Sequence, residues 1–186
     1  PQTPFHLCES SVRLANFCGD HGVASMHHCQ QWQTKQDKGT ARMSSIIKHG
    51  SAHWEGGIKN GKGTVSTQSG ALDQQPYGFN TRFEGQPGTN PEELLGAAHA
   101  ACFSMALSLI LGEAGLTASS IDTRADVSLS KTEGGFEITS ITLTLKARVP
   151  NATPQQFAEL ANKAKVGCPV SKLFRAPVTL DATLLG

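Results

Sequence analysis

The stretch that decides the fold is residues 90–115, which read NPEELLGAAHAACFSMALSLILGEAG. Thr89 or Asn90 can act as the N-cap of a helix, and Pro91 suits the first helical position. The two glutamates that follow complement the positive end of the helix dipole. We therefore predict a helix over 91–114 that stops at the glycine closing the stretch.

This helix has no charged residue from Leu94 to Gly112, a run of 19 residues. The run is long enough to span a bilayer. We do not expect a membrane-spanning helix, because the run is rich in alanine, glycine and serine. It is also flanked by glutamates rather than by lysine or arginine. A helix that is apolar all round must be buried all round, and a domain of this size has too little surface to cover it. We therefore expect an obligate homodimer with this helix near its two-fold axis.

The flanking segments predict an α+β domain. A hairpin is expected over 51–67, and residues 68–90 are polar and rich in glycine and proline. Alternation predicts strands over 126–130 and 136–149, with a slip near Thr139 that indicates a bulge. The remaining expectations are a helix capped by Asn151 or Thr153 and closed by Gly167, one helical turn over 169–174, and a strand over 178–184.

Composition divides the chain of 186 residues in two, with a break before Met43. Residues 1–42 hold three of the five cysteines and four of the seven histidines, and we expect an N-terminal extension outside the fold. It lacks the apolar run of a secretory signal. A zinc site over 18–29 is not expected, because paired ligand spacing is absent. The net charge of +1 also argues against a nucleic-acid-binding protein.

Residues 43–186 retain two cysteines, Cys102 and Cys168. Cys102 lies in the middle of the long helix, where a buried core thiol is the simpler interpretation. Cys168 precedes Pro169, so it can be the N-cap of a helix, where the dipole and free N–H groups favour a thiolate. Local electrostatics make Cys168 the better activated thiol. Cys102 needs a cation brought to it by the fold, and Arg82 is the nearest candidate.

Five motifs in order strongly resemble the OsmC/Ohr family of bacterial peroxide-defence proteins. The resemblance covers about residues 43–186 and leaves out 1–42. Its motifs are GTVST at 63–67, QQPYGFNTRFEG at 74–85, GTNPEEL at 88–94, AAHAACFSMALS at 97–108 and KxGCPVS at 165–171.

The resemblance implies an intertwined α+β homodimer with a long buried central helix packed against β-sheets. It implies a thiol-dependent peroxidase that prefers organic hydroperoxides over hydrogen peroxide and needs no metal or cofactor. Cys102 matches the peroxidatic cysteine and Cys168 the resolving one, so that the two form a disulfide. Arg82 and Glu92 match the residues that support the thiolate. A dithiol or lipoyl-protein reductant and a cytoplasmic location complete these expectations.

Helix geometry constrains this site, since ten residues separate Glu92 from Cys102, or about 15 Å along a straight helix. Either Glu92 comes from the other subunit or the helix breaks between them, and we favour composite sites at the dimer interface. We expect an apolar pocket for alkyl hydroperoxides. Its candidate residues are Phe79, Phe83, Phe103 and Met105.

Two other interpretations stay open. His99 is three residues before Cys102 and could act as a base, although a packed, hydrogen-bonded histidine is the simpler interpretation. The whole chain could instead be a non-enzymatic dimeric stress protein that binds an apolar ligand. In that case a cysteine at a helix start has no explanation.

Overall fold

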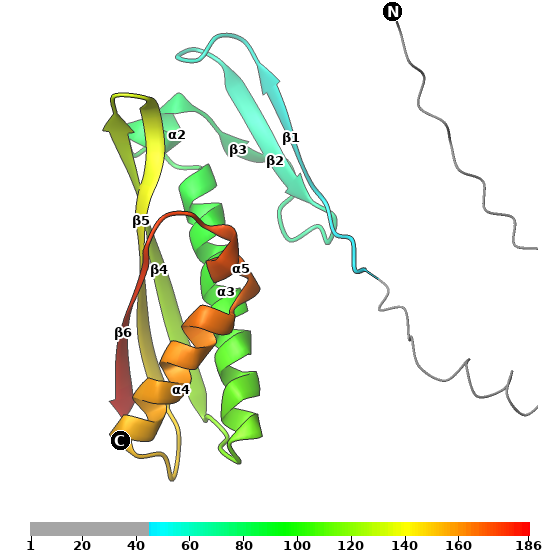
Figure 1. Ribbon diagram of the computed structural model, residues 1–186. Coiled ribbons are helices and arrows are strands. Elements are labelled where there is room, and N and C mark those ends of the chain that lie inside the picture. The colour runs from blue at the N-terminus through cyan, green and yellow to red at the C-terminus, as the bar shows by residue number, and fades with distance from the viewer. Residues whose placement is uncertain (1–44) are drawn as a thin grey trace, which may run out of the picture. The chain divides into compact units, whose positions relative to one another are not determined.

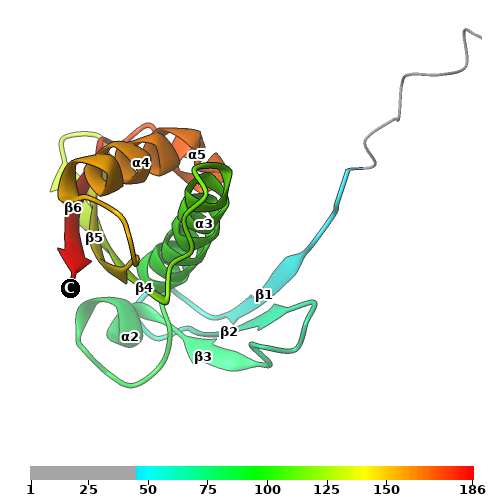
Figure 2. The same ribbon diagram turned by 90° about the horizontal axis from the view of Figure 1, so that it is seen from below.

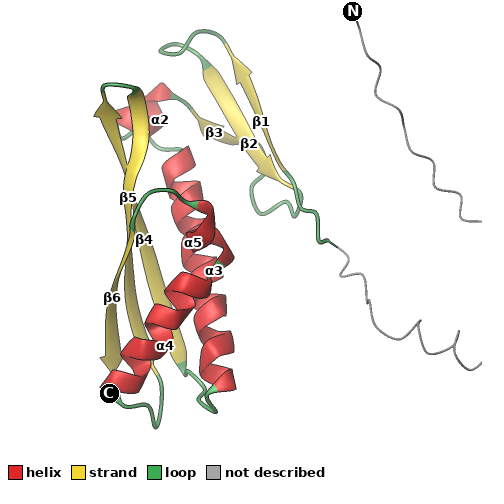
Figure 3. Ribbon diagram, viewed as in Figure 1, coloured by secondary structure: helices red, strands yellow, loops and turns green. Residues whose placement is uncertain are grey.

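The computed structural model describes residues 45–186, and an α+β fold occupies 48–186 (Figure 1). Figure 3 shows the alternation of helices and strands. The elements, in chain order, are β1 (Gly50–Glu55), β2 (Lys62–Thr67), β3 (Gln75–Tyr77), α2 (Phe79–Phe83), α3 (Pro91–Glu113), β4 (Ser120–Thr132), β5 (Gly135–Arg148), α4 (Pro154–Gly167), α5 (Pro169–Leu173) and β6 (Val178–Leu185).

The larger sheet has the strand order β4-β5-β6. β4 and β5 form an antiparallel hairpin that turns at Glu133 and Gly134, and Gly135 after the turn has a φ of 119°, which favours glycine. The register shifts between Ser128 and Leu129, which leaves Thr139 of β5 as the extra residue. The predicted bulge is therefore confirmed. β6 pairs in parallel with β5, so α4 and α5 form the crossover between these two strands.

α3 and α4 pack on the same face of this sheet, as Figure 2 shows. α3 begins as predicted, because the Asn90 side chain accepts a hydrogen bond of 2.9 Å from the Glu93 N–H. It runs without a break to Glu113. Phe103, Leu107 and Leu111 of α3 are fully buried against Leu143 and other inward-facing residues of β5. α4 adds Phe157, Ala161 and Ala164 to this core.

The smaller sheet, with strand order β1-β2-β3, leads into α3 through the single-turn helix α2. Strands β1 and β2 form the predicted hairpin. β3 and α2 lie in the segment that the sequence predicted as irregular. β3 has three residues, centred on Pro76, that pair with β2. So short a segment with a proline in its middle has no sequence pattern typical of a strand. α2 is likewise too short for a periodic signal.

The other predicted elements agree with the structure at their cores. β4 is longer than predicted, because the alternation of Val127 and Leu129 continues back through Ala125, Thr123 and Ile121 in the part that pairs along β5 from Ser120. Thr153, rather than Asn151, is the N-cap of α4 and accepts from the Gln156 N–H. The short helix α5 and the strand β6 lie where the sequence predicted them.

One face of α3 is not buried in the single chain, and this is the part of the helix that we expect a second subunit to cover. The helix is apolar and long enough to span a membrane, yet only 28% of its most hydrophobic 18-residue window is buried. Met105 is 75% exposed and Leu109 is 65% exposed. The exposed, uncharged residues follow one helical stripe: Ala97, Ala98, Ala101, Met105, Ser108, Leu109 and Gly112. The opposite face of α3 packs on the sheet, as in the core helix of a globular domain.

We expect substitution of Gly96 to test how closely α3 approaches β4. A Cβ added at Gly96 lies 2.9 Å from the Ala125 carbonyl oxygen, whereas one at Gly112, in the same helix, meets nothing within 4 Å. Gly96→Ala is expected to lower the free energy of unfolding by about 1 kcal/mol, because overpacking outweighs the gain in helix propensity. Gly112→Ala is expected to raise it by about 0.5 kcal/mol. Urea unfolding measures both, and equal effects would contradict the close approach.

Candidate active site

Cys102 and Cys168 lie together although 65 residues separate them in the chain. Cys102 comes from the middle of α3, and Cys168 from the junction between α4 and α5. Both are free thiols, with Cys102 half-buried and Cys168 fully buried. Cys102 packs against the core cluster that contains Cys168, and each thiol shifts the pKa of the other. Two neighbouring thiols can be oxidised to a disulfide.

The start of α5 makes Cys168 the more acidic thiol of the pair. Burial raises its pKa, but hydrogen bonds outweigh this effect and hold the pKa below its usual value. They come from the Ser171 N–H and hydroxyl, the Val170 N–H and the Cys102 thiol. Cys168 is the N-cap of α5, with Pro169 at the first helical position, as predicted. A thiolate at Cys168 is therefore stabilised by α5 and by Cys102.

Cys102 has the opposite environment. Burial raises its pKa, the Val170 N–H lowers it, and both the hydrogen bond and the charge of Cys168 raise it further. The net pKa lies above the usual value. Arg82 is not among the groups that act on Cys102 within the described chain. The single chain therefore does not supply the cation that the sequence analysis expected for this thiol.

Arg82 and Glu92 form an ion pair at the start of α3, away from the two cysteines. Arg82 lies in α2, and its Nε and Nη2 donate to the two Glu92 carboxylate oxygens at 3.0 and 2.6 Å. The Arg82 guanidinium carbon also lies 5.2 Å from the centre of the Phe83 ring. Such a bidentate pair fixes the plane of the guanidinium and leaves Nη1 free for another acceptor.

The continuous helix keeps the two pairs apart within one chain. Glu92 is in the first turn of α3 and Cys102 is in its middle, and no break separates them. The distance along the axis is therefore about 15 Å. Of the two alternatives from the sequence, a break in the helix is contradicted.

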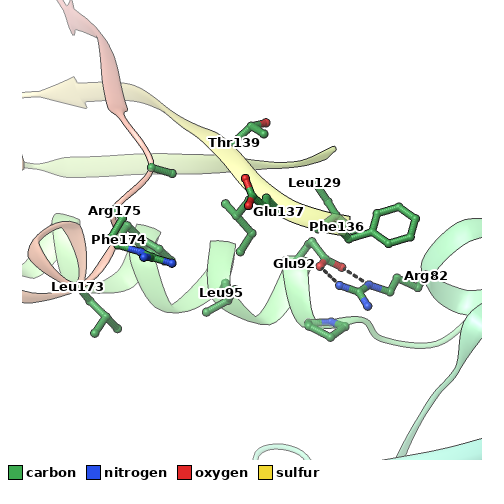
Figure 4. A pocket seen from close by; sticks show the side chains of 13 residues that line it. Arg82, Glu92, Leu95, Leu129, Phe136, Glu137, Thr139, Leu173, Phe174 and Arg175 are labelled. Atoms are coloured by element: carbon green, nitrogen blue, oxygen red, sulfur yellow. Dashed lines mark hydrogen bonds and ion pairs between the residues drawn. The ribbon is translucent and has the colours of Figure 1, made fainter. Parts of the chain in front are cut away.

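A cavity of about 890 Å³ connects the region of the ion pair with the end of α5. Figure 4 shows Arg82 and Glu92 at one end, Leu173, Phe174 and Arg175 at the other, and Leu95 of α3 between them. Its lining combines apolar side chains with charged and polar ones: Leu129, Phe136, Ile138 and Ala176 line it together with Arg82, Glu92, Glu137, Thr139 and Arg175. A groove with apolar walls and a guanidinium near each end suits a ligand that has an alkyl body and a polar head.

The family follows from sequence comparison. A family model described as "OsmC-like protein" matches residues 83–183. The chain is 65% identical over 140 residues to "Peroxiredoxin OsmC" of Escherichia coli, covering 75% of this chain and 98% of that protein. The chain belongs to the OsmC family.

More distant relatives of this OsmC-family protein agree. "Organic hydroperoxide resistance protein OhrB" of Bacillus subtilis is 36% identical over 124 residues, covering 66% of this chain and 88% of that protein. Its crystal structure superimposes with a TM-score of 0.56 at 32% identity, covering 73% of this chain and 98% of that chain. An organic hydroperoxide resistance protein from Legionella pneumophila gives a TM-score of 0.58 at 28% identity, covering 76% and 99% of the two chains.

The four residues expected to form a pocket in this OsmC-family protein do not lie together. Phe79 and Phe83 of α2 line a small cavity of about 220 Å³ with Arg82. Phe103 is fully buried in the core and Met105 is exposed on the open face of α3. The larger cavity is lined instead by residues that the sequence analysis missed, such as Phe136 and Leu173. In the sequence, Phe136 and Leu173 stand out only as apolar residues beside a hairpin turn and at the end of a short helix. The tertiary fold brings these two positions together.

His99 is fully buried, and its Nε2 lies 2.8 Å from the Ser171 hydroxyl. Phe174 packs against the ring, with centroids 5.4 Å apart. Burial lowers the pKa of His99, so the imidazole is neutral at pH 7. Its Nδ1 is buried and has no hydrogen-bond partner within residues 45–186. The packed, hydrogen-bonded histidine is confirmed. Ser171 was missed, although it is three residues beyond the N-cap.

Within residues 45–186, no group of three or more His, Cys, Asp or Glu side chains is arranged to hold a metal ion. The segment 18–29, and the extension 1–42 to which it belongs, lie outside the described residues. The domain boundary at Met43 therefore stays a prediction.

We expect Cys168 to react as a thiolate below the ordinary cysteine pKa of about 8.5. In the folded chain the pKa is lowered, so its alkylation by iodoacetamide should reach half its maximal rate at a lower pH than in urea. Peptide mapping after alkylation at each pH follows Cys168 separately from the other cysteines. Identical profiles for folded and unfolded chains would contradict the stabilised thiolate.

Proposed function

We propose that this protein is a thiol-dependent peroxidase that reduces organic hydroperoxides to alcohols, with Cys102 as the peroxidatic and Cys168 as the resolving cysteine. The contact between the two thiols is the observation that carries the proposal. The names of the Escherichia coli and Bacillus subtilis relatives support it. A protein that only bound an apolar ligand would need neither the contact nor a thiolate-stabilising helix start at Cys168.

The reaction follows from thiol chemistry. The Cys102 thiolate attacks the distal peroxide oxygen, the O–O bond breaks, and the alkoxide takes a proton to leave as the alcohol. Cys102 is then a sulfenic acid. The Cys168 thiolate attacks the sulfenic sulfur, and hydroxide leaves as water after taking a proton. A dithiol, such as a lipoyl protein, reduces the disulfide by exchange and leaves with its own disulfide.

A second copy of the chain completes the site in this proposal. Cys102 needs a cation, because its surroundings in one chain raise its pKa. Arg82 cannot provide it within that chain, since Glu92 holds it near the start of α3. The open stripe of α3 is the apolar, uncharged face that a homodimer would cover. Arg82 of the second subunit would then lie over Cys102, with Nη1 free to polarise the peroxide.

The alkyl group of the substrate is placed in the 890 Å³ cavity, between the Arg82–Glu92 pair and α5. The apolar part of its lining, which includes Leu129, Phe136 and Leu173, favours organic hydroperoxides over hydrogen peroxide, which has no alkyl group to bury. The dithiol requirement suits a reducing compartment, and we place the protein in the cytoplasm.

The Cys102→Ser variant is expected to lose cumene hydroperoxide turnover by more than about 1,000-fold, as when a nucleophile is removed. Consumption is measured with cumene hydroperoxide and hydrogen peroxide in parallel, with dihydrolipoamide as reductant. A control with Cys8, Cys18 and Cys29 changed to serine should keep wild-type turnover. Negligible rates in wild type and variant alike, with a working reductant, would favour the ligand-binding alternative.

Mixed dimers test whether the site is composite. Arg82→Ala and Cys102→Ser chains are each expected to be nearly inactive. After unfolding and refolding together in equal amounts, about a quarter of the sites should combine an intact Arg82 with an intact Cys102 from different chains. Recovery of about a quarter of wild-type turnover is expected. No recovery, with mixed dimers demonstrated by mass, would place both residues of each site in one chain.

A further inference from the structure

His99 is a buried titratable group that the peroxidase chemistry above does not use. It lies one helical turn before Cys102 on α3, fully buried, with its Nε2 2.8 Å from the Ser171 hydroxyl of α5. That hydroxyl is in turn among the hydrogen-bond donors that act on Cys168. A series of hydrogen bonds therefore runs from His99 of α3 through Ser171 of α5 to the thiol of Cys168, which lies between α4 and α5.

The direction of these hydrogen bonds follows from what each group can donate. The Ser171 hydroxyl has one proton, so when it donates to Cys168 its oxygen must accept from His99. His99 is neutral because burial lowers its pKa, so the one ring proton is then on Nε2. Nδ1 is left as a bare acceptor, which agrees with its lack of a partner within residues 45–186.

The neighbours of the imidazole hold it in this position. The Phe174 ring packs against His99 at a centroid distance of 5.4 Å and an interplanar angle of 44°. Because a buried polar atom without a partner is rare in proteins, the unpaired Nδ1 calls for a reason to keep histidine here. A donor aimed at Ser171 is such a reason, and an aliphatic side chain could not replace it.

We propose that His99 is a positioning residue of the peroxidase: its Nε2–H holds the Ser171 hydroxyl in the orientation that donates to Cys168, so that Cys168 meets the Cys102 sulfenic acid as a thiolate. The inference rests on the proposed function, since it concerns the step that forms the disulfide. In that step the Cys168 sulfur bonds to the Cys102 sulfur, the S–O bond of the sulfenic acid breaks, and hydroxide leaves with a proton as water.

Other groups near Cys168 do not replace this role. The elements packed against α5 are α3 and α4. Of the titratable groups of α3, Cys102 acts on Cys168 directly and His99 through Ser171, whereas Glu92, Glu93 and Glu113 lie in the first and last turns of the helix. The lysines nearest in sequence, Lys165 of α4 and Lys172 of α5, are not among the groups that set the Cys168 pKa. Neutral hydrogen-bond donors therefore stabilise the thiolate in the described part of the chain, and Ser171 is the one whose orientation His99 controls.

The first test is the pH profile of Cys168 alkylation in the full chain, followed by peptide mapping. Ser171→Ala is expected to raise the Cys168 pKa by about one unit, which corresponds to loss of one hydrogen bond to a charged group. His99→Leu should shift it in the same direction. The conservative variants Ser171→Thr and His99→Gln keep a hydrogen-bond donor, so their Cys168 pKa should lie closer to the wild-type value.

Ser104→Ala is the matched control, because this α3 hydroxyl is bonded to Thr123 at 2.8 Å and serves β4 rather than Cys168. It should leave the profile unchanged. A folded Ser171→Ala variant with the wild-type profile would overturn the proposal, even if His99→Leu fails to fold.

The second test is the fate of Cys102 after a small excess of cumene hydroperoxide without reductant. Slower attack by Cys168 leaves time for a second peroxide to convert the sulfenic acid to sulfinic acid, releasing a second alcohol. Ser171→Ala should raise the ratio of sulfinic acid to disulfide by about tenfold, since one pKa unit changes the thiolate fraction by up to this factor. An unchanged ratio would contradict the role of His99 and Ser171.

The two tests separate this inference from the proposed function. If wild-type Cys102 is not oxidised at all, the peroxidase proposal fails. The alkylation profiles would still show whether His99 and Ser171 hold Cys168 as a thiolate. If Cys102 is oxidised normally and neither the profile nor the ratio changes in the variants, only the positioning role fails.

Discussion

The uninterrupted course of α3 is the constraint on which the rest of the structure depends. It runs from Pro91 to Glu113 because its interior has no proline or charged residue and one face is filled by Phe103, Leu107 and Leu111 against the sheet. The same rigidity separates Glu92 from Cys102 by about 15 Å. The carboxylate that fixes Arg82 and the thiol that needs a cation are thus parts of one helix that cannot meet. This separation is the reason why we propose a site assembled from two copies of the chain.

Cys102 and Cys168 differ in acidity because of their surroundings. Cys168 receives hydrogen bonds from the start of α5 and from Cys102, which lower its pKa, whereas Cys102 is partly desolvated and faces the charge of Cys168, which raises its pKa. In a single chain Cys168 is therefore the readier thiolate. In our proposal, positive charge from a second subunit activates Cys102, which would link its reactivity to assembly.

Apolar surface left open by one chain has the same explanation. Met105 and Leu109 are exposed on α3, and Phe136 and Leu173 are exposed along the cavity that leads from Arg82 to α5. Isolated exposed apolar residues need no explanation, but an apolar helical stripe and a groove with exposed aromatic and aliphatic walls on the same molecule indicate binding surfaces. We assign the stripe to a second copy and the groove to the alkyl group of the substrate.

The sequence by itself determined the elements whose patterns are local. The α3 cap at Asn90, the bulge at Thr139 and the helix start at Cys168 each depend on residues within a few positions, so they could be predicted from the chain alone. Helical periodicity also predicted that Glu92 and Cys102 could not meet. Only the tertiary structure decided which distant residues lie together: the contact of Cys102 with Cys168, the cavity walls Phe136 and Leu173, and the pairing of His99 with Ser171. These contacts depend on how the α4–α5 crossover packs on α3, and that packing is a property of the whole core rather than of any local pattern.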